Sequence, residues 1–131
     1  MRKSILMLLL AAVSGSAAAE WVKLAAGAGE GNTLHADPAT IRRAGNKVKM
    51  WSLVDHQMAL TDSFGKSHAS EKVHWEYDCK DEQQRMLAYV TFSENLAKGK
   101  AVYSDSEPGK WKPVAADTPE EALWKIACGK K

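Results

Sequence analysis

Hydrophobic and polar residues alternate along two long segments of the chain, and this period of two predicts β-strands. The first segment covers residues 47–55, with Val48, Met50 and Val54 on one face. The second covers residues 71–79, and one of its faces carries Val73, Trp75, Tyr77 and Cys79. Because alternate side chains of a strand point to opposite sides of a sheet, we expect Cys79 to face the core.

Shorter segments of the same character complete a predicted antiparallel sheet. They cover residues 21–24, 33–37, 85–93 and 101–104, with turn residues between them. A turn at residues 80–83 joins 71–79 to 85–93 as a hairpin. One face of 85–93 is expected to carry Met86, Ala88, Val90 and Phe92.

Two stretches interrupt the alternating pattern. The strand 33–37 is expected to stop at Pro38, and Asp37 is placed to cap a helical turn with Pro38 at its first position. Residues 56–70 show no regular spacing of hydrophobic and polar residues. This predicts a long mobile loop, which is the first place to look for a binding function.

The C-terminal segment predicts a helix over residues 118–128. Thr118 can cap it, Pro119 suits its first position and Glu121 completes a capping box. Gly129 is expected to end the helix. Its apolar stripe consists of Leu123, Ile126 and Ala127, with Trp124 and Cys128 beside it. Such a stripe needs a partner surface, so we expect the helix to pack on the sheet.

The N-terminus has the pattern of a secretory signal peptide, which we expect to comprise residues 1–19. Arg2 and Lys3 form a positive start, residues 5–13 are apolar, and residues 17–19 are a small-residue cleavage site. The apolar run is too short to span a bilayer, so no membrane span is expected. No cysteine lies near the cut, so a lipid anchor is not expected either. The predicted location is the periplasm or the cell surface and extracellular space.

Cleavage would leave one domain of ordinary size. Removing 19 residues from 131 leaves 112, residues 20–131. The leader carries two of the 18 basic residues, so 16 Lys and Arg face 16 Asp and Glu in the remainder. A nucleic-acid partner is not expected, because a nucleic-acid surface would show a basic excess or stripe.

Both cysteines, Cys79 and Cys128, lie after the leader. In an oxidising compartment an even number of thiols is most simply explained by pairing. We therefore expect one disulfide that ties the helix to the sheet. A free redox pair and an intermolecular bridge are the alternatives.

The sequence predicts no enzyme, because no nucleophile, base and orienting group can be assembled from it. Residues 65–67 resemble the end of a phosphate-binding loop, but Leu60 stands where that motif requires glycine. The histidines show no metal-ligand spacing, so neither a metal nor another cofactor is predicted. They are His35, His56, His68 and His74.

Five tryptophans are many for a domain of this size. Trp75 and Trp124 fit the predicted core, whereas Trp51 and Trp111 are less easily placed. These two are therefore candidate binding residues, as aromatic anchors for a protein or for a small ligand. The alternative is that all five pack between helix and sheet.

Several segments of the chain, taken in order, are distinctive: "EWVKL", "DPATIRRAGNKVKMW", "WEYDCK" and "SEPGKWKPV" followed by "EALWKIACGKK". Together they make the chain resemble the surface-adhesin protein E family of bacterial exported proteins. The resemblance covers residues 20–131. It implies an α+β fold, a single antiparallel β-sheet with a C-terminal helix packed on one face and tied to it by the Cys79–Cys128 bridge.

The resemblance also implies a function. Adhesins of this family bind host proteins such as laminin, vitronectin and plasminogen, and members can dimerise. We therefore expect an exported, non-enzymatic, adhesin-like protein-binding domain. The alternatives are a periplasmic envelope-associated structural protein without a host partner and a small-ligand carrier. The terminal Lys130 and Lys131 are further candidate binding residues, because plasminogen's kringle modules recognise C-terminal lysine.

Overall fold

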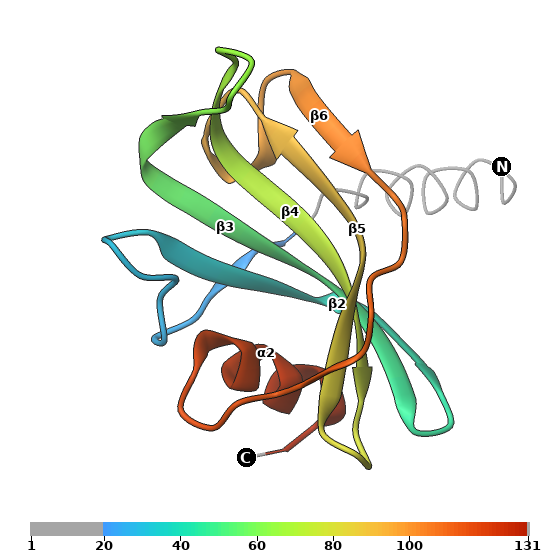
Figure 1. Ribbon diagram of the computed structural model, residues 1–131. Helices are drawn as coiled ribbons and strands as arrows, with labels where there is room; N and C mark the ends of the chain where they lie inside the picture. Colours follow the sequence, from blue (N-terminus) through green and yellow to red (C-terminus); the bar gives the residue numbers. More distant parts are fainter. Residues whose placement is uncertain (1–19, 131) are drawn as a thin grey trace, which may run out of the picture.

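A twisted antiparallel sheet with one helix packed against it makes up residues 20–130, which the computed structural model describes (Figure 1). The strands are β1 (Val22–Lys23), β2 (Thr33–Ala44), β3 (Lys47–Thr61), β4 (Ser67–Asp78), β5 (Gln83–Phe92) and β6 (Ala101–Asp105). They are neighbours in that order, and β7 (Lys112–Pro113) pairs with β5. The predicted signal peptide, residues 1–19, and Lys131 lie outside the described residues.

Two short elements complete residues 20–130. A 3₁₀ turn, η1 (Asn95–Ala97), lies between β5 and β6, and helix α2 (Pro119–Cys128) follows β7. Because the six main strands are neighbours in chain order, most sheet contacts form between adjacent segments. The predicted fold class, a single antiparallel sheet with a C-terminal helix, is confirmed.

Helix α2 begins and ends at the residues that the sequence predicts. Thr118 Oγ1 accepts a hydrogen bond from the Glu121 amide at 3.2 Å, and the carboxylate of Glu121 reaches back to the Asp117 amide at 3.3 Å. Gly129 closes the helix in a left-handed conformation with φ of 69°, which glycine adopts without a Cβ penalty. Short local signals therefore fix both ends of the helix.

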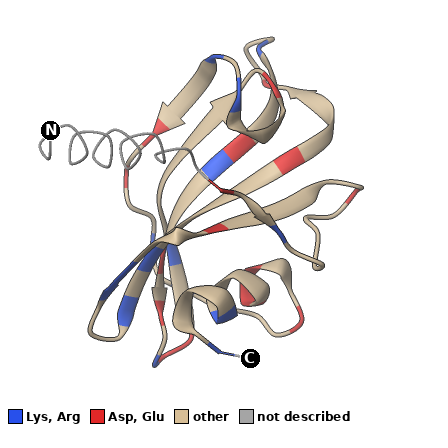
Figure 2. Ribbon diagram, turned by 180° about the vertical axis from the view of Figure 1, so that it is seen from behind, with Lys and Arg blue, Asp and Glu red and all other residues tan. Residues whose placement is uncertain are grey.

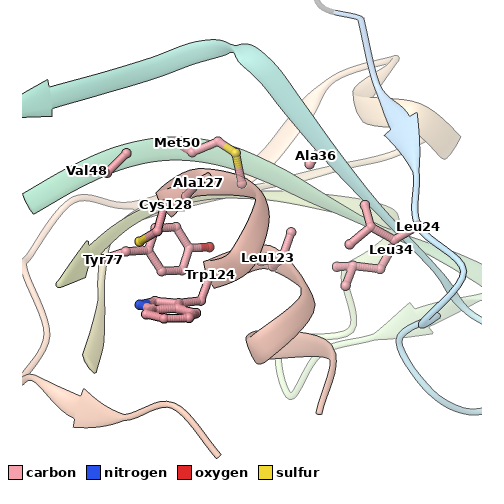
Figure 3. Packing of buried hydrophobic residues seen from close by; sticks show 10 residues of the cluster. All are labelled: Leu24, Leu34, Ala36, Val48, Met50, Tyr77, Leu123, Trp124, Ala127 and Cys128. Carbon is pink, nitrogen blue, oxygen red and sulfur yellow. The ribbon is translucent and has the colours of Figure 1, made fainter. Parts of the chain in front are cut away.

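The core lies between α2 and one face of the sheet (Figure 3). It consists of Leu24, Leu34, Ala36, Val48, Met50, Tyr77, Leu123, Trp124, Ala127 and Cys128. The indole N–H of Trp124 donates to the Asp78 carbonyl at 3.0 Å, which satisfies the buried polar group of the ring. The expected disulfide joins Cys79, directly after β4, to Cys128, the last residue of α2.

The predicted helical turn after Pro38 is wrong, because β2 continues through it to Ala44. The β2–β3 register jumps between Asp37 and Arg42, so extra residues bulge out of the ladder at the proline. A proline costs no ladder bond at a bulge. The Thr40 hydroxyl spans the gap: it donates to the Asp37 carbonyl at 2.6 Å and accepts from the Trp51 amide at 3.0 Å.

The predicted mobile loop over residues 56–70 is also wrong. Strand β3 runs on to Thr61 and β4 begins at Ser67, so only residues 62–66 form the turn. Asp55 pairs with Ser70 but Leu60 pairs with His68, which means that β3 carries additional residues between them. These residues break the period of two without ending the strand.

A third register shift changes the predicted face of β5. Trp75 pairs with Met86, whereas the preceding residue His74 pairs with Ala88, so Leu87 is an extra residue in β5. Met86 therefore points to the side of α2, and Ala88 and Val90 point to the other side. The prediction that Met86, Ala88, Val90 and Phe92 share one face is wrong for this reason.

Among residues 20–130, no helix has the length and apolar character that crossing a membrane requires.

Candidate binding surface

The face of the sheet opposite α2, here called the outer face, carries both tryptophans that the sequence singles out. Trp51 is on β3 and directly opposite His74 of β4. Trp111 precedes β7 and lies against Lys47 of β3 and Arg85 of β5. The positions on β3 that share a face with Trp51 alternate with the core residues Val48 and Met50. The two candidate residues are thus brought onto one side of the sheet.

Trp51 is held by two close neighbours on β4, His74 and Lys72. Its ring stacks on His74 with centroids 4.5 Å apart and planes 6° from parallel. The ammonium of Lys72 lies 4.8 Å from the centre of the Trp51 ring and 5.8 Å from that of Phe92. These distances are typical of cation–π contacts. The indole is half-buried, so one part of it is fixed by packing while the rest stays accessible.

The ring of Trp111 contacts two cationic side chains. Lys47 Nζ lies 5.6 Å and Arg85 4.9 Å from its ring centre. Both cations also pair with buried carboxylates: Arg85 with Glu76 at 2.7 Å and Lys47 with Asp78 at 3.2 Å. These ion pairs hold the cations in place, so the half-buried indole of Trp111 has a fixed position. We call the set formed by Trp51, His74, Lys72, Phe92, Trp111, Lys47 and Arg85 the aromatic row.

The charge on the outer face is uneven. The acids Glu76 and Asp78 compensate Arg85 and Lys47, whereas within residues 20–130 neither Lys49 nor Lys72 forms an ion pair. Basic residues also gather on the β2–β3 hairpin, where Arg42, Arg43, Lys47 and Lys49 flank the turn (Figure 2). This end of the outer face therefore suits a partner with acidic groups.

The environment of His74 favours its neutral form. Burial lowers the pKa of His74, and the nearby charge of Lys49 lowers it further, while Glu76 opposes both. Burial likewise lowers the pKa of His35, on β2. At neutral pH a neutral imidazole therefore stacks on Trp51.

A short segment covers the other end of the outer face. The Asp55 carboxylate accepts hydrogen bonds from the Leu96 amide at 2.7 Å and the Asn95 side chain at 3.1 Å. The Ser70 hydroxyl donates to the Glu94 carbonyl at 2.6 Å. These bonds hold η1 against β3 and β4. Leu53, on the same face of β3 as Asp55, is fully buried.

Lys130 is less free than the sequence suggests. The Lys130 amide donates to the Lys125 carbonyl at 2.8 Å and the Gly129 amide donates to the Ile126 carbonyl at 3.3 Å. Lys130 is therefore part of the helix end, although its side chain is exposed. Lys131 lies outside the described residues.

The row contains residues that sequence reasoning did not select. Lys72, His74 and Phe92 carry no signal of their own, because a lysine and a histidine on the polar face of a strand are ordinary. They become candidates because the β3–β4 register places His74 beside Trp51. That register depends on the geometry of the turn between the two strands, which the sequence alone does not specify.

One cluster on the other side of the sheet has the composition of a metal site. His56 of β3 lies near His68 and Glu71 of β4, and one nitrogen or oxygen of each lies within 4.8 Å of the others. His56 is buried, whereas His68 and Glu71 are partly exposed.

Comparison with known protein families matches residues 21–129 to the family described as surface-adhesin protein E. Crystal structures of Haemophilus influenzae protein E share the fold. One has a TM-score of 0.66 at 13% identity over 83% of each chain. A second crystal form has a TM-score of 0.64 at 15% identity over 82% of this chain and 96% of that one. Protein E from a non-typeable strain has a TM-score of 0.60 at 14% identity over 84% of each chain.

A comparison with curated protein sequences finds no match. The family match nevertheless spans almost all of the described sheet and helix, from Trp21 to the Gly129 that closes α2. The similar structures carry the same fold. The chain therefore belongs to the surface-adhesin protein E family.

Proposed function

We propose that this protein is an exported, non-enzymatic binding domain that recognises a host extracellular protein through the aromatic row. Membership of an adhesin family supports an adhesin-like role. The observation that carries the proposal is the pair of half-buried tryptophans, Trp51 and Trp111, each held by cations on an open sheet face. Tryptophan and arginine are the residues that most often dominate the energy of protein interfaces.

The chemistry of the row defines the kind of partner. A partner with apolar side chains would cover the two indoles, and acidic groups would meet Lys49 and Lys72. The family resemblance names laminin, vitronectin and plasminogen as the host proteins to test first. A small-ligand carrier is less well supported, because carriers enclose their ligand, whereas these indoles lie on an open face.

Binding is tested with the purified domain, residues 20–131. Residues 20–130 form one sheet-and-helix unit with its own core, so this segment is expected to fold without the leader. Immobilised laminin, vitronectin and plasminogen are each titrated with the domain at physiological salt. We expect saturable binding to at least one of them. The absence of saturable binding to any of the three would contradict recognition of these partners.

The cellular location of the protein distinguishes an adhesin from the alternative, a periplasmic structural protein without a host partner. The measurement is labelling of exposed lysines on intact cells with a reagent that does not cross the outer membrane. A periplasmic protein of known location is the control. An adhesin is labelled on intact cells, whereas a periplasmic structural protein is labelled only after the cells are opened.

Capture of plasminogen through the terminal lysines is a finer proposal. It depends on Lys131, because Lys130 is held in the end of α2. A variant that lacks Lys130 and Lys131 is compared with the intact domain, with and without a soluble lysine analogue. Equal capture by both forms would exclude the terminal-lysine mechanism and leave binding through the aromatic row unaffected.

A further inference from the structure

His56 is a buried imidazole with no hydrogen-bond partner. It is 7% exposed, and both of its ring nitrogens are buried without a donor or acceptor in reach. A buried polar group without a partner is unfavourable, and native structures usually supply one. The geometry around His56 therefore calls for a ligand that imidazole nitrogen can bind.

The neighbours of His56 are themselves metal-ligand types. The His68 ring lies edge-on to that of His56, with centroids 5.4 Å apart and planes at 72°. Glu71 completes a group in which one ligand atom of each residue lies within 4.8 Å of the others. Atoms bound about 2 Å from one ion lie roughly 3.3 Å from each other. Small rotations of the partly exposed His68 and Glu71 would close the remaining distance.

The register shift in β3 brings these residues together. Asp55 pairs with Ser70, and the next pair in the ladder is Leu60 with His68, so His56 lies in the bulge beside β4. In a regular ladder His56 would be opposite Ala69. The cluster is thus a product of the bulge, and no spacing in the sequence reveals it. Bulges often re-aim side chains at functional positions.

We propose that His56, His68 and Glu71 bind a divalent transition-metal ion, with zinc the best match. Two imidazoles and one carboxylate are the protein ligands of many zinc sites that keep a fourth position open. Calcium and magnesium prefer sites made of oxygen alone, so the two imidazoles select against them. The proposal gives one of the two unpartnered nitrogens of His56 a role.

The surroundings provide access and support for a bound ion. His68 and Glu71 line a surface cavity of about 310 Å³, together with Asp62, Ser63, Phe64, Tyr89, Thr91 and Tyr103. Thr91 is directly opposite Glu71 in the β4–β5 ladder, and its buried hydroxyl has no partner. It is therefore available to donate to the Glu71 carboxylate, as groups behind metal ligands commonly do. The open fourth position would be filled by water from this cavity.

The test is calorimetric titration of the tag-free domain, residues 20–131, with zinc chloride. We expect one zinc ion per chain, and His68→Ala and Glu71→Gln should each weaken binding by about tenfold or more. Both residues are partly exposed, so these variants are expected to fold. The matched control is His74→Ala, which removes a histidine from the outer face and should leave zinc binding unchanged.

Cobalt provides a second readout that reports on the ligands themselves. When the domain is titrated with cobalt chloride, a cobalt ion bound by two imidazoles and a carboxylate should produce visible absorption bands. The His68→Ala variant should lose these bands. The proposal is wrong if the wild-type domain binds no zinc. It is equally wrong if His68→Ala and Glu71→Gln bind zinc as tightly as the wild type, since the ion would then be held elsewhere.

Discussion

Trp51 shows how several weak contacts fix one side chain on an open surface. Its backbone amide is held by the Thr40 hydroxyl, its ring stacks on His74, and Lys72 lies over it. Each contact contributes little alone, with cation–π contacts at exposed sites worth about 0.5–1 kcal/mol. Together they orient the indole, and under the proposed binding role this preorganisation would lower the entropy lost on binding.

The stack of Trp51 on His74 has a consequence for stability in acid. Because burial and Lys49 lower the pKa of His74, the unfolded chain binds a proton at a higher pH than the folded protein does. The contribution of His74 to the free energy of unfolding is therefore complete above about pH 6.5. It is lost as the pH falls through the folded-state pKa of His74. His35, whose pKa is also lowered by burial, acts in the same direction.

We therefore predict that the urea midpoint of the wild-type domain falls between pH 7.5 and pH 5.5. The fall should be smaller in His74→Phe, which keeps an aromatic ring beside Trp51 and removes the titrating group. His35 remains in this variant, so part of the fall should persist. An identical fall in wild type and His74→Phe would show that His74 does not contribute to the acid sensitivity.

At the scale of elements, a single disulfide bond ties helix α2 to the sheet. Its buried face consists of Leu123, Trp124, Ala127 and Cys128, and the disulfide to Cys79 holds its last turn against the end of β4. The bridge spans 49 residues of sequence, and closing a loop of that length is worth at most about 4 kcal/mol in the chain-entropy account. That is a large share of the stability of a small domain.

Reduction should therefore lower the melting temperature of the domain markedly. The measurement is thermal unfolding followed by circular dichroism with and without dithiothreitol, together with a thiol count. The native protein should show no free thiol among its two cysteines. A Cys79→Ala/Cys128→Ala variant is the control and should not respond to the reductant. A wild-type melting temperature that the reductant leaves unchanged would contradict a stabilising bridge.

Helix α2 and the regular parts of the strands could be predicted because their signals are local. The cap at Thr118 and the stop at Gly129 act within one turn, and residues 47–55 pair with β4 without a register shift. The errors at Pro38, at residues 56–70 and at Leu87 have one cause. Each coincides with a register shift, which keeps the ladder but breaks the period of two on which strand prediction depends.

At the scale of the whole molecule, the sheet separates two surfaces with different chemistry. One face carries the core, α2 and the cluster of His56, His68 and Glu71. The outer face carries the aromatic row. Sequence analysis selected Trp51 and Trp111 because these tryptophans did not fit the predicted core. It could not name their neighbours or the histidine cluster, since both depend on which residues of β3 and β4 pair across the sheet.

The central claim is that the aromatic row is the binding surface. It is tested most directly by measuring the affinity of Trp51→Ala and Trp111→Ala for the host protein that binds the wild-type domain best. Truncating an interface anchor costs about 2 kcal/mol or more, so each variant should bind roughly thirtyfold more weakly. Phe64→Ala is the control, because Phe64 is 85% exposed in the turn between β3 and β4, outside the row. Wild-type affinity in both tryptophan variants, with their folds intact, would contradict the claim.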